Sequence, residues 1–570
     1  MHRGRSWTAA GVRSGPGVGS DPVRRRPVSI PSAAKRCSSV NSPGSWRRGP
    51  SLDLPMGIRF RRRRWRSRGP TARAGPGHTP AVAMRVAFIA AECEPWAKTG
   101  GLADVVDALA RALGQVGSPH VEAPVDVFIP NYRGVPVPAD ATARELSIPD
   151  PRHAGRSLDL RTLEAETHGY RLHLVDHPPA FDREGMYGTP SADHPDNAWR
   201  FGILCRAALE RLRHEPRPPD VVHIHDWHAV PALLQRDRGI PELVGAAFLL
   251  TIHNLAYHGW TPANQVRDLG LGRAALPKGA DGLDLLKVGI EQADIVNTVS
   301  PGFAAEALRP EYGMGLDRAL RARGDRFFGI VNGLDTDLWN PATDAALAAT
   351  YSRENRRGKA RCREALLTEL GLDPSDPKPV LAMIGRLDRQ KGFDLLAGAA
   401  PALLRRGIRL AVLGSGSPDV VAPLRDLAAK PAGRKGIALV ERFDRDLARR
   451  MYAGADGFLM PSRFEPCGTG QMIALRYGTP PIVRATGGLR DTVIDVTADP
   501  KRGTGFAFEG ESPGGLVDAC DRFLAAFQPG SRQWESLLDR GMAVDFDWRS
   551  SSTPAYIAAY HRAATIRRST

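Results

Sequence analysis

The chain contains few cysteines and no long apolar run. Its six cysteines are scattered through 570 residues without CxxC spacing, which indicates neither a zinc site nor a disulfide framework and favours a reducing compartment. The longest apolar stretches, such as 244–252, are far shorter than the roughly 20 residues that a membrane-spanning helix needs. We therefore expect a soluble, cytoplasmic protein with no membrane partner.

Acidic residues are almost absent from the first 83 positions. This segment has 18 Lys and Arg against Asp21 and Asp53, a net charge of +16 that equals the charge of the whole chain. The remaining 487 residues are therefore neutral. A strongly basic chain would ordinarily suggest a nucleic-acid partner, with 61–65 (RRRRW) as a phosphate-binding arm. We expect no such partner, because the globular part has no excess of positive charge.

Residues 1–83 also lack periodic apolar positions and the apolar core of about 7–15 residues that a secretory signal requires, so we expect a disordered basic extension. Two origins remain open for this extension. An organelle transit peptide, which would place the protein in a plastid, shares its Arg-rich, Ser-rich and acid-poor composition. We favour translated GC-rich upstream DNA, because Arg outnumbers Lys by 68 to 10 in the chain. Met84 would then be the true start.

From Met84 onward, short β-branched apolar runs alternate with amphipathic segments, a pattern typical of parallel sheets covered by helices on both faces. The predicted strands form two series, 85–90, 125–129, 221–225, 247–253 and 295–299, then 380–384, 408–413, 438–441, 457–460 and 481–483. We predict an α/β fold with two doubly wound, Rossmann-like domains, 84–345 and 346–545, that face each other across a cleft. Residues 546–570 should form a C-terminal helix that packs back on the first domain.

A lysine and two glycines follow the first predicted strand. Residues 98–101 (KTGG) precede a helical pattern with Leu102, Val105 and Leu109 on one face. Glycines let backbone amides approach a ligand, and a helix N-terminus attracts anions, so this turn is a candidate diphosphate site. An ordinary Gly-rich turn is the alternative, and the GxxxxGK[ST] spacing of a P-loop is absent.

Three histidines and a carboxylate in 223–228 (HIHDWH) are residue types that bind zinc. If 221–225 is a strand, however, His223 and His225 share one face, and Asp226 lies beyond its carboxyl end, where α/β sheets bind ligands. The strand predicted at 247–253 ends likewise in polar groups, His253 and Asn254. We therefore predict a substrate site here and no metal.

Two further motif matches are weak. Residues 335–337 (DTD) match the DxD triad with which some glycosyltransferases hold a divalent metal, but the sequence favours a turn with local side-chain hydrogen bonds. Residues 414–416 (GSG) lack the third glycine of a dinucleotide fingerprint, so they are weak evidence for a nicotinamide cofactor.

The second half contains two charged, Gly-containing segments, each after a predicted strand. In 385–392 (GRLDRQKG), Arg386 and Lys391 stand five residues apart, a spacing suited to clamping both phosphates of a nucleoside diphosphate. In 461–470 (PSRFEPCGTG), Glu465 is followed by glycines that free backbone amides at a helix start. Solvated charges would explain either segment alone. Together they predict a site that binds a sugar through Glu465 and its leaving diphosphate through the two cations.

These motifs resemble those of the bacterial glycogen synthases and plant starch synthases, retaining glycosyltransferases with two Rossmann-like domains in the GT-B arrangement. The resemblance covers Met84 to about Ala564. It is carried by seven ordered segments, namely KTGGLADVV at 98–106, HIHDWH at 223–228, TIHNLAYHG at 251–259, GIVNGLDTDLWNPATD at 329–344, GRLDRQKG at 385–392, PSRFEPCG at 461–468 and ALRYGTPPIVRATGGLRDTV at 474–493.

The resemblance implies transfer of glucose from ADP-glucose to the non-reducing 4-hydroxyl end of an α-1,4-glucan such as glycogen, with retained configuration and no cofactor. It implies catalytic roles for Asp226, His253, Arg386, Lys391 and Glu465. The substrate-binding residues that it implies are Lys98, Gly100, Gly101, Asp104, Tyr187, Asn254, Asn332, Cys467, Gly468 and Thr469. The oligomeric state stays open.

The sequence departs from related families in two places. A second glutamate eight positions after Glu465 is replaced by Ile473, which excludes a mechanism with two glutamates. Thr469 and Gly470 stand where Leu-Thr or Leu-Gly is more familiar, so only backbone contacts are expected there. Two alternatives remain: a sucrose synthase-like enzyme that uses uridine diphosphate sugars, and a glucan-binding scaffold with a disabled site.

Overall fold

The computed structural model describes residues 83–570 except 117–119, 190, 237–239 and 272–275. The expectations for a basic extension at 1–83, including the RRRRW arm, fall on residues outside this part, apart from residue 83. The described residues belong to one compact unit, residues 77–570. No helix among them is long and apolar enough to cross a membrane.

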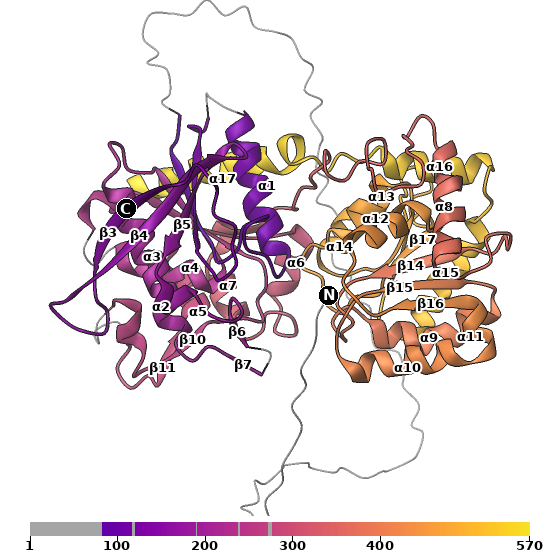
Figure 1. Ribbon diagram of the computed structural model, residues 1–570, viewed down its shortest axis with the longest axis horizontal. Coiled ribbons are helices and arrows are strands. Elements are labelled where there is room, and N and C mark those ends of the chain that lie inside the picture. Colours follow the sequence, from indigo (N-terminus) through magenta and orange to yellow (C-terminus); the bar gives the residue numbers. More distant parts are fainter. Residues whose placement is uncertain (1–82, 117–119, 190, 237–239, 272–275) are drawn as a thin grey trace, which may run out of the picture. The chain divides into compact units, whose positions relative to one another are not determined.

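The N-terminal half is built on a nine-stranded sheet with the order β13-β12-β9-β8-β1-β2-β5-β4-β3 (Figure 1). Its strands are β1 (Val86–Ile89), β2 (Val125–Pro130), β3 (Thr142–Pro149), β4 (Ser157–Thr167), β5 (Tyr170–Asp176), β8 (Val221–His225), β9 (Ala247–Ile252), β12 (Ile295–Thr298) and β13 (Phe327–Gly329). All neighbouring pairs from β13 to β5 run parallel. β1, β2, β8 and β9 are buried along their whole length, which explains their continuous apolar runs.

Helices pack against this sheet. They are α1 (Gly101–Val116), α2 (Pro178–Phe181), α3 (Asn197–Arg213), α4 (Asp226–Arg236), α5 (Leu285–Gln292), α6 (Pro301–Ala307) and α7 (Asp317–Ala322). Two short antiparallel pairs lie outside the main sheet, β6 (Gly188–Thr189) with β7 (Ala192–Asp193) and β10 (Trp260–Pro262) with β11 (Gly282–Asp284). The apolar face predicted for the first helix is correct, because Leu102, Val105 and Leu109 are buried.

The edge of this sheet differs from the parallel pattern that we predicted. β3 and β4 run antiparallel to each other, and β4 runs antiparallel to β5. β3 is the outer strand, and most of its residues are exposed, including Arg144 and Glu145. The sequence of an exposed strand carries charges instead of an apolar run, and this is why the hairpin was not predicted.

The C-terminal half has a six-stranded, wholly parallel sheet with the order β16-β15-β14-β17-β18-β19. Its strands are β14 (Val380–Ile384), β15 (Arg409–Leu413), β16 (Ile437–Val440), β17 (Gly457–Met460), β18 (Pro481–Arg484) and β19 (Phe506–Phe508). The helices of this half are α8 (Arg357–Glu369), α9 (Phe393–Arg405), α10 (Pro418–Ala429), α11 (Pro431–Gly436), α12 (Arg445–Gly454), α13 (Gly470–Arg476), α14 (Gly487–Thr492), α15 (Pro513–Ala526) and α16 (Arg532–Met542). The predicted fold of two α/β domains with parallel sheets is confirmed.

The chain returns to the first sheet at its C-terminal end. Helix α17 (Thr553–Arg568) packs against β8, β9 and β12, and its Tyr560 hydroxyl is hydrogen-bonded to the ring of His223, 2.9 Å away. The returning segment meets the outgoing one, because Leu334 pairs with Asp547 and Gly333 lies against the ring of Trp548. The chain therefore passes between the two halves twice, and the two connecting segments lie side by side.

Candidate active site

Lys391 and Glu465 form a close ion pair at the carboxyl edge of the C-terminal sheet. The Lys391 Nζ lies 2.6 Å from Glu465 Oε2, and the hydroxyl of Ser462 donates to the same oxygen at 3.1 Å. Glu465 is only 4% exposed, so its charge is balanced by Lys391 in a largely dry setting. The two loops approach closely because Gly392 has φ of +78°, and a Cβ there would lie 2.1 Å from the carbonyl oxygen of Pro461.

Arg386 belongs to the same edge but makes no contact with this pair. Its side chain is 62% exposed, and its guanidinium lies 3.4 Å from Gln390 Oε1 and 3.6 Å from Asp388. Such long contacts to exposed groups hold the side chain weakly. Arg386 is therefore a cation that an anionic ligand can recruit.

The loop that follows Glu465 is ordered by a buried glutamine. The Gln471 side-chain amide donates to the carbonyl oxygens of Cys467 and Gly468, both at 3.0 Å. Gly468 has φ of +75°, a conformation that suits glycine. Thr469 precedes α13 without a capping hydrogen bond from its side chain. The Thr469 hydroxyl therefore does not cap this helix.

Asp226 and His253 lie together at the carboxyl edge of the N-terminal sheet, because β8 and β9 are parallel neighbours. The His253 backbone amide donates to Asp226 Oδ1 at 2.7 Å. Asp226 has φ of +53°, which is uncommon outside glycine and better tolerated by Asp and Asn. Burial raises the pKa of Asp226 to about 7, although backbone hydrogen bonds from His253 and Asn254 oppose this.

The other histidines of this edge serve a structural network. The ring of His223 is hydrogen-bonded to Thr251 Oγ1 at 2.6 Å as well as to Tyr560, so both of its nitrogens are used. The rings of His225 and His253 lie 3.1 Å apart between Nδ1 and Nε2. Burial lowers the pKa of His223 and His225 well below the usual value and that of His253 to about 3, which keeps all three neutral. Their imidazoles therefore act as neutral hydrogen-bonding groups.

The turn at 98–101 is held by Glu92, a residue that the sequence analysis missed. The backbone amides of Thr99 and Gly100 donate to Glu92 Oε2 at 2.6 and 3.0 Å, and the Thr99 hydroxyl donates to Oε1 at 2.7 Å. Tyr187 also donates its hydroxyl to Glu92 Oε1. The only signal in the sequence was the position of Glu92 just after β1. A carboxylate thus already binds two of the amides that we expected to face a diphosphate.

The side-chain ammonium of Lys98 also forms ion pairs. Its Nζ lies 2.6 Å from Asp104 and 3.1 Å from Glu94, and the side chain is 40% exposed. The positions of Gly100 and Gly101 are open, since a Cβ at either would meet no atom within 4 Å. Glu94 lies 3.9 Å from Arg445 of α12, which links this turn to the C-terminal half.

Contacts between the two halves bring the Glu465 loop to the N-terminal sheet. The hydroxyl of Ser300, just after β12, donates to the carbonyl oxygen of Pro466 at 2.5 Å. The ring of Phe303 meets that of Phe464 edge-on, with centroids 5.0 Å apart. Because β12 is the neighbour of β9, this contact places the Glu465 loop on the sheet edge that carries His253.

Asn332 and Cys467 meet at the same contact. The thiol of Cys467 is hydrogen-bonded to the backbone of Asn332, and burial raises the pKa of that thiol to about 12. The thiol is therefore protonated at neutral pH and is no nucleophile. The side-chain oxygen of Asn332 is buried without a hydrogen-bond partner among the described residues. A side-chain oxygen that can still accept a hydrogen bond thus lies beside the Glu465 loop.

The DTD segment forms the predicted turn. Asp335 Oδ1 accepts hydrogen bonds from the backbone amides of Asp337 and Leu338, and Asp335 Oδ2 accepts one from Arg111. The two amide contacts are local, as the turn requires, and the contact with Arg111 ties the turn to α1.

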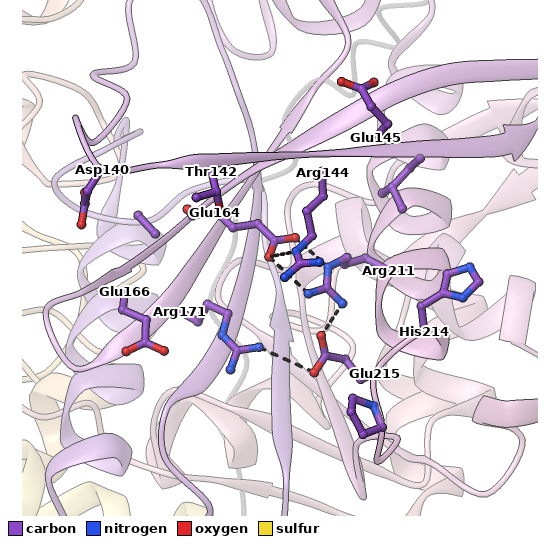
Figure 2. Close-up of a pocket in the computed structure, with 13 residues that line it drawn as sticks. Asp140, Thr142, Arg144, Glu145, Glu164, Glu166, Arg171, Arg211, His214 and Glu215 are labelled. Carbon is purple, nitrogen blue, oxygen red and sulfur yellow. Dashed lines mark hydrogen bonds and ion pairs between the residues drawn. The ribbon is translucent and has the colours of Figure 1, made fainter.

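One cavity of the N-terminal half has none of the predicted site residues in its lining. It is an open groove of about 850 Å³ along β3 and β4, near the end of α3 (Figure 2). Its charged groups largely pair with one another, as Arg211 does with Glu164 and Glu215.

Comparison with known proteins identifies the family. Residues 85–322 match the family model described as starch synthase catalytic domain, and residues 372–529 match glycosyl transferases group 1. A glycogen synthase of Anaeromyxobacter sp. (strain Fw109-5) is 43% identical over 493 residues, which cover 84% of this chain and all of that protein. A glycogen synthase of Syntrophotalea carbinolica is 40% identical over 85% of this chain and 99% of its own length.

The structure agrees with this relationship. The catalytic domain of starch synthase IV from Arabidopsis thaliana, solved bound to ADP and acarbose, superimposes with a TM-score of 0.75 at 32% identity. The match covers 85% of this chain and all of that domain. The chain therefore belongs to the glycogen and starch synthase family of glycosyltransferases.

Proposed function

We propose that the protein transfers glucose from ADP-glucose to the non-reducing 4-hydroxyl end of an α-1,4-glucan, with retention of configuration. The observation that carries this proposal is the partly buried Lys391–Glu465 pair. The exposed Arg386 lies on the same loop as Lys391, and the Glu465 loop contacts the N-terminal sheet through Ser300. The ADP and acarbose bound to the Arabidopsis relative support a nucleotide-sugar donor and a glucan acceptor. Residues 346–545 would hold the donor, and residues 84–345 would present the acceptor.

The leaving diphosphate gains negative charge as the bond from glucose C1 to phosphate breaks. Lys391 can exchange its contact with Glu465 for a phosphate oxygen, and Arg386 can swing to a second one, because its present contacts are weak. Cations brought next to the departing oxygens stabilise the developing charge, and most strongly where bound substrates exclude water. The Glu465 carboxylate is then free to accept hydrogen bonds from glucose hydroxyls.

The N-terminal groups favour attack on the same face as the leaving group over a double displacement. One carboxylate oxygen of Asp226 already accepts a hydrogen bond from the His253 amide, which makes that oxygen less available to attack glucose C1. Position 473 is a buried isoleucine, so it offers no second carboxylate. The acceptor hydroxyl would then attack from the side of the diphosphate, whose oxygens take up its proton.

A donor assay tests the proposal. Glycogen is incubated with labelled ADP-glucose or UDP-glucose, the transferred glucose is counted, and the anomeric configuration of the new linkage is read by NMR. Efficient transfer from ADP-glucose into α-1,4 linkages supports the proposal. Preferential use of UDP-glucose would show that the proposed donor is wrong. No transfer from either sugar would favour the alternative of a glucan-binding scaffold with a disabled site.

We also propose the cytoplasm as the site of action. The five cysteines that the structure describes are free and buried, as a reducing compartment allows.

A further inference from the structure

Two large aromatic side chains stand in solvent within four residues of each other. Tyr257 is 60% exposed and Trp260 is 56% exposed. Most other large apolar residues with similar exposure in the described part are aliphatic, and Phe443 in the C-terminal half is the third aromatic one. Burial of a large aromatic ring stabilises a folded protein, and these two rings do not contribute that stabilisation. Neighbouring exposed aromatic rings therefore indicate a surface that a ligand covers.

The segment that carries these rings is held rigidly. Asp284 contacts His258 Nδ1 at 2.7 Å and also caps α5 by accepting a hydrogen bond from the Lys287 amide at 2.9 Å. Trp260 pairs with Asp284 in the β10–β11 ladder. Its indole lies against Gly282, where a Cβ would come within 2.7 Å of the ring. A rigid ring loses little conformational entropy when a ligand covers it.

The same segment folds onto the predicted acceptor side. Gly259 has φ of +68°, and a Cβ there would lie 2.3 Å from the ring of Trp227, the residue after Asp226. His253 precedes Tyr257 by only four residues, a span of at most about 14 Å. The exposed rings therefore lie close to the groups that would receive the end of the glucan.

We infer that Tyr257 and Trp260 form an aromatic platform that binds the glucan chain behind its reacting end. The inference rests on the proposed function for the identity of the acceptor. The C–H faces of glucose pack on aromatic faces, while the tyrosine hydroxyl and the indole N–H supply polar contacts at the ring edges. The carboxylate of Asp284, opposite Trp260, favours a neutral sugar over an anionic nucleotide.

Kinetics of Trp260→Ala and Tyr257→Ala test the platform. Each substitution should raise the KM for maltoheptaose or glycogen on the order of tenfold, since a lost ring contact is worth about one factor of ten. The KM for ADP-glucose and the kcat at saturating glucan should stay within about twofold. Trp260→Phe should retain most of the affinity. Phe443→Ala should leave the KM for glucan unchanged, because that exposed ring lies in the half that would hold the donor.

A binding measurement separates this inference from the proposed function. Titration of the full chain with maltoheptaose, followed by calorimetry, should show affinity that Trp260→Ala weakens and Phe443→Ala does not. A wild-type protein that binds the oligosaccharide through Trp260 but transfers no glucose would overturn the proposed function alone. Unchanged glucan binding and KM in both platform variants, or a changed KM for ADP-glucose only, would overturn the platform.

Discussion

Charge at individual residues explains how this site can stabilise a departing diphosphate. Lys391 is kept in place by Glu465, whereas Arg386 is kept mobile by its exposure. Lys391→Ala or Arg386→Ala should lower kcat about 100-fold or more, as loss of one electrostatic stabiliser does. The adjacent Arg389, whose side chain is 71% exposed and whose closest acidic partner is 3.6 Å away, provides the matched control. Steady-state rates within a few fold of wild type for Lys391→Ala would contradict the assignment.

Burial of Asp226 links stability to pH. The unfolded carboxyl ionises near pH 4, whereas burial raises the pKa of the folded one to about 7, so the unfolded state gains relative stability as the pH rises between these values. Asp226→Asn keeps an acceptor for the His253 amide and tolerates the positive φ. It should therefore unfold like wild type near pH 4 and be more stable at pH 8, by a few kcal/mol on the order of the pKa shift.

Urea denaturation of Asp226→Asn and wild type from pH 4 to pH 8.5 measures this difference. A gap in the free energy of unfolding that stays constant over the range would show that burial does not hold the carboxyl protonated.

At the scale of the elements, the turn at 98–101 is held in place by the side chain of one residue, Glu92. Glu92 holds four donors there, two of them backbone amides. Glu92→Ala should release the turn, speed hydrogen exchange of the Thr99 and Gly100 amides, and raise the KM for ADP-glucose about tenfold or more, because all four donors lose their partner. Glu94→Gln is the control, since the Glu94 carboxylate pairs with the side chains of Lys98 and Arg445. Unchanged exchange in Glu92→Ala would rule out this role.

Elements whose signal lies in a short stretch of sequence were predicted, whereas features that depend on contacts between distant parts of the chain were not. Strands such as β8 and β17 are buried along their length, so their apolar runs identified them directly. The β3–β4 hairpin was missed because an exposed edge strand has no such run. Glu92 was missed because its partner Tyr187 is 95 residues away and only the folded chain joins them. The placement of Asp226 and His253 at the carboxyl ends of strands was predicted from the apolar runs before them, and the parallel pairing of β8 with β9 brings the two residues together.

At the scale of the whole molecule, the proposed reaction needs groups from both halves. Lys98 and His253 belong to the N-terminal half, and Arg386 and Glu465 to the other, while α6 and α14 hold the halves together. Glu306 of α6 accepts a hydrogen bond from the Gly487 amide at 2.9 Å at this contact. Since Lys98 is paired with its own neighbours and Arg386 is exposed, we predict that substrates draw the halves together about this contact.

Small-angle scattering of the full chain should therefore show a smaller radius of gyration with ADP and maltoheptaose than without them. Lys391→Ala should need much higher ADP concentrations for the same change, because it removes one of the cations that pull on the diphosphate. The same full chain is used in every sample. Identical scattering with and without both ligands, at concentrations where calorimetry shows them bound, would mean that the site works without movement of the halves.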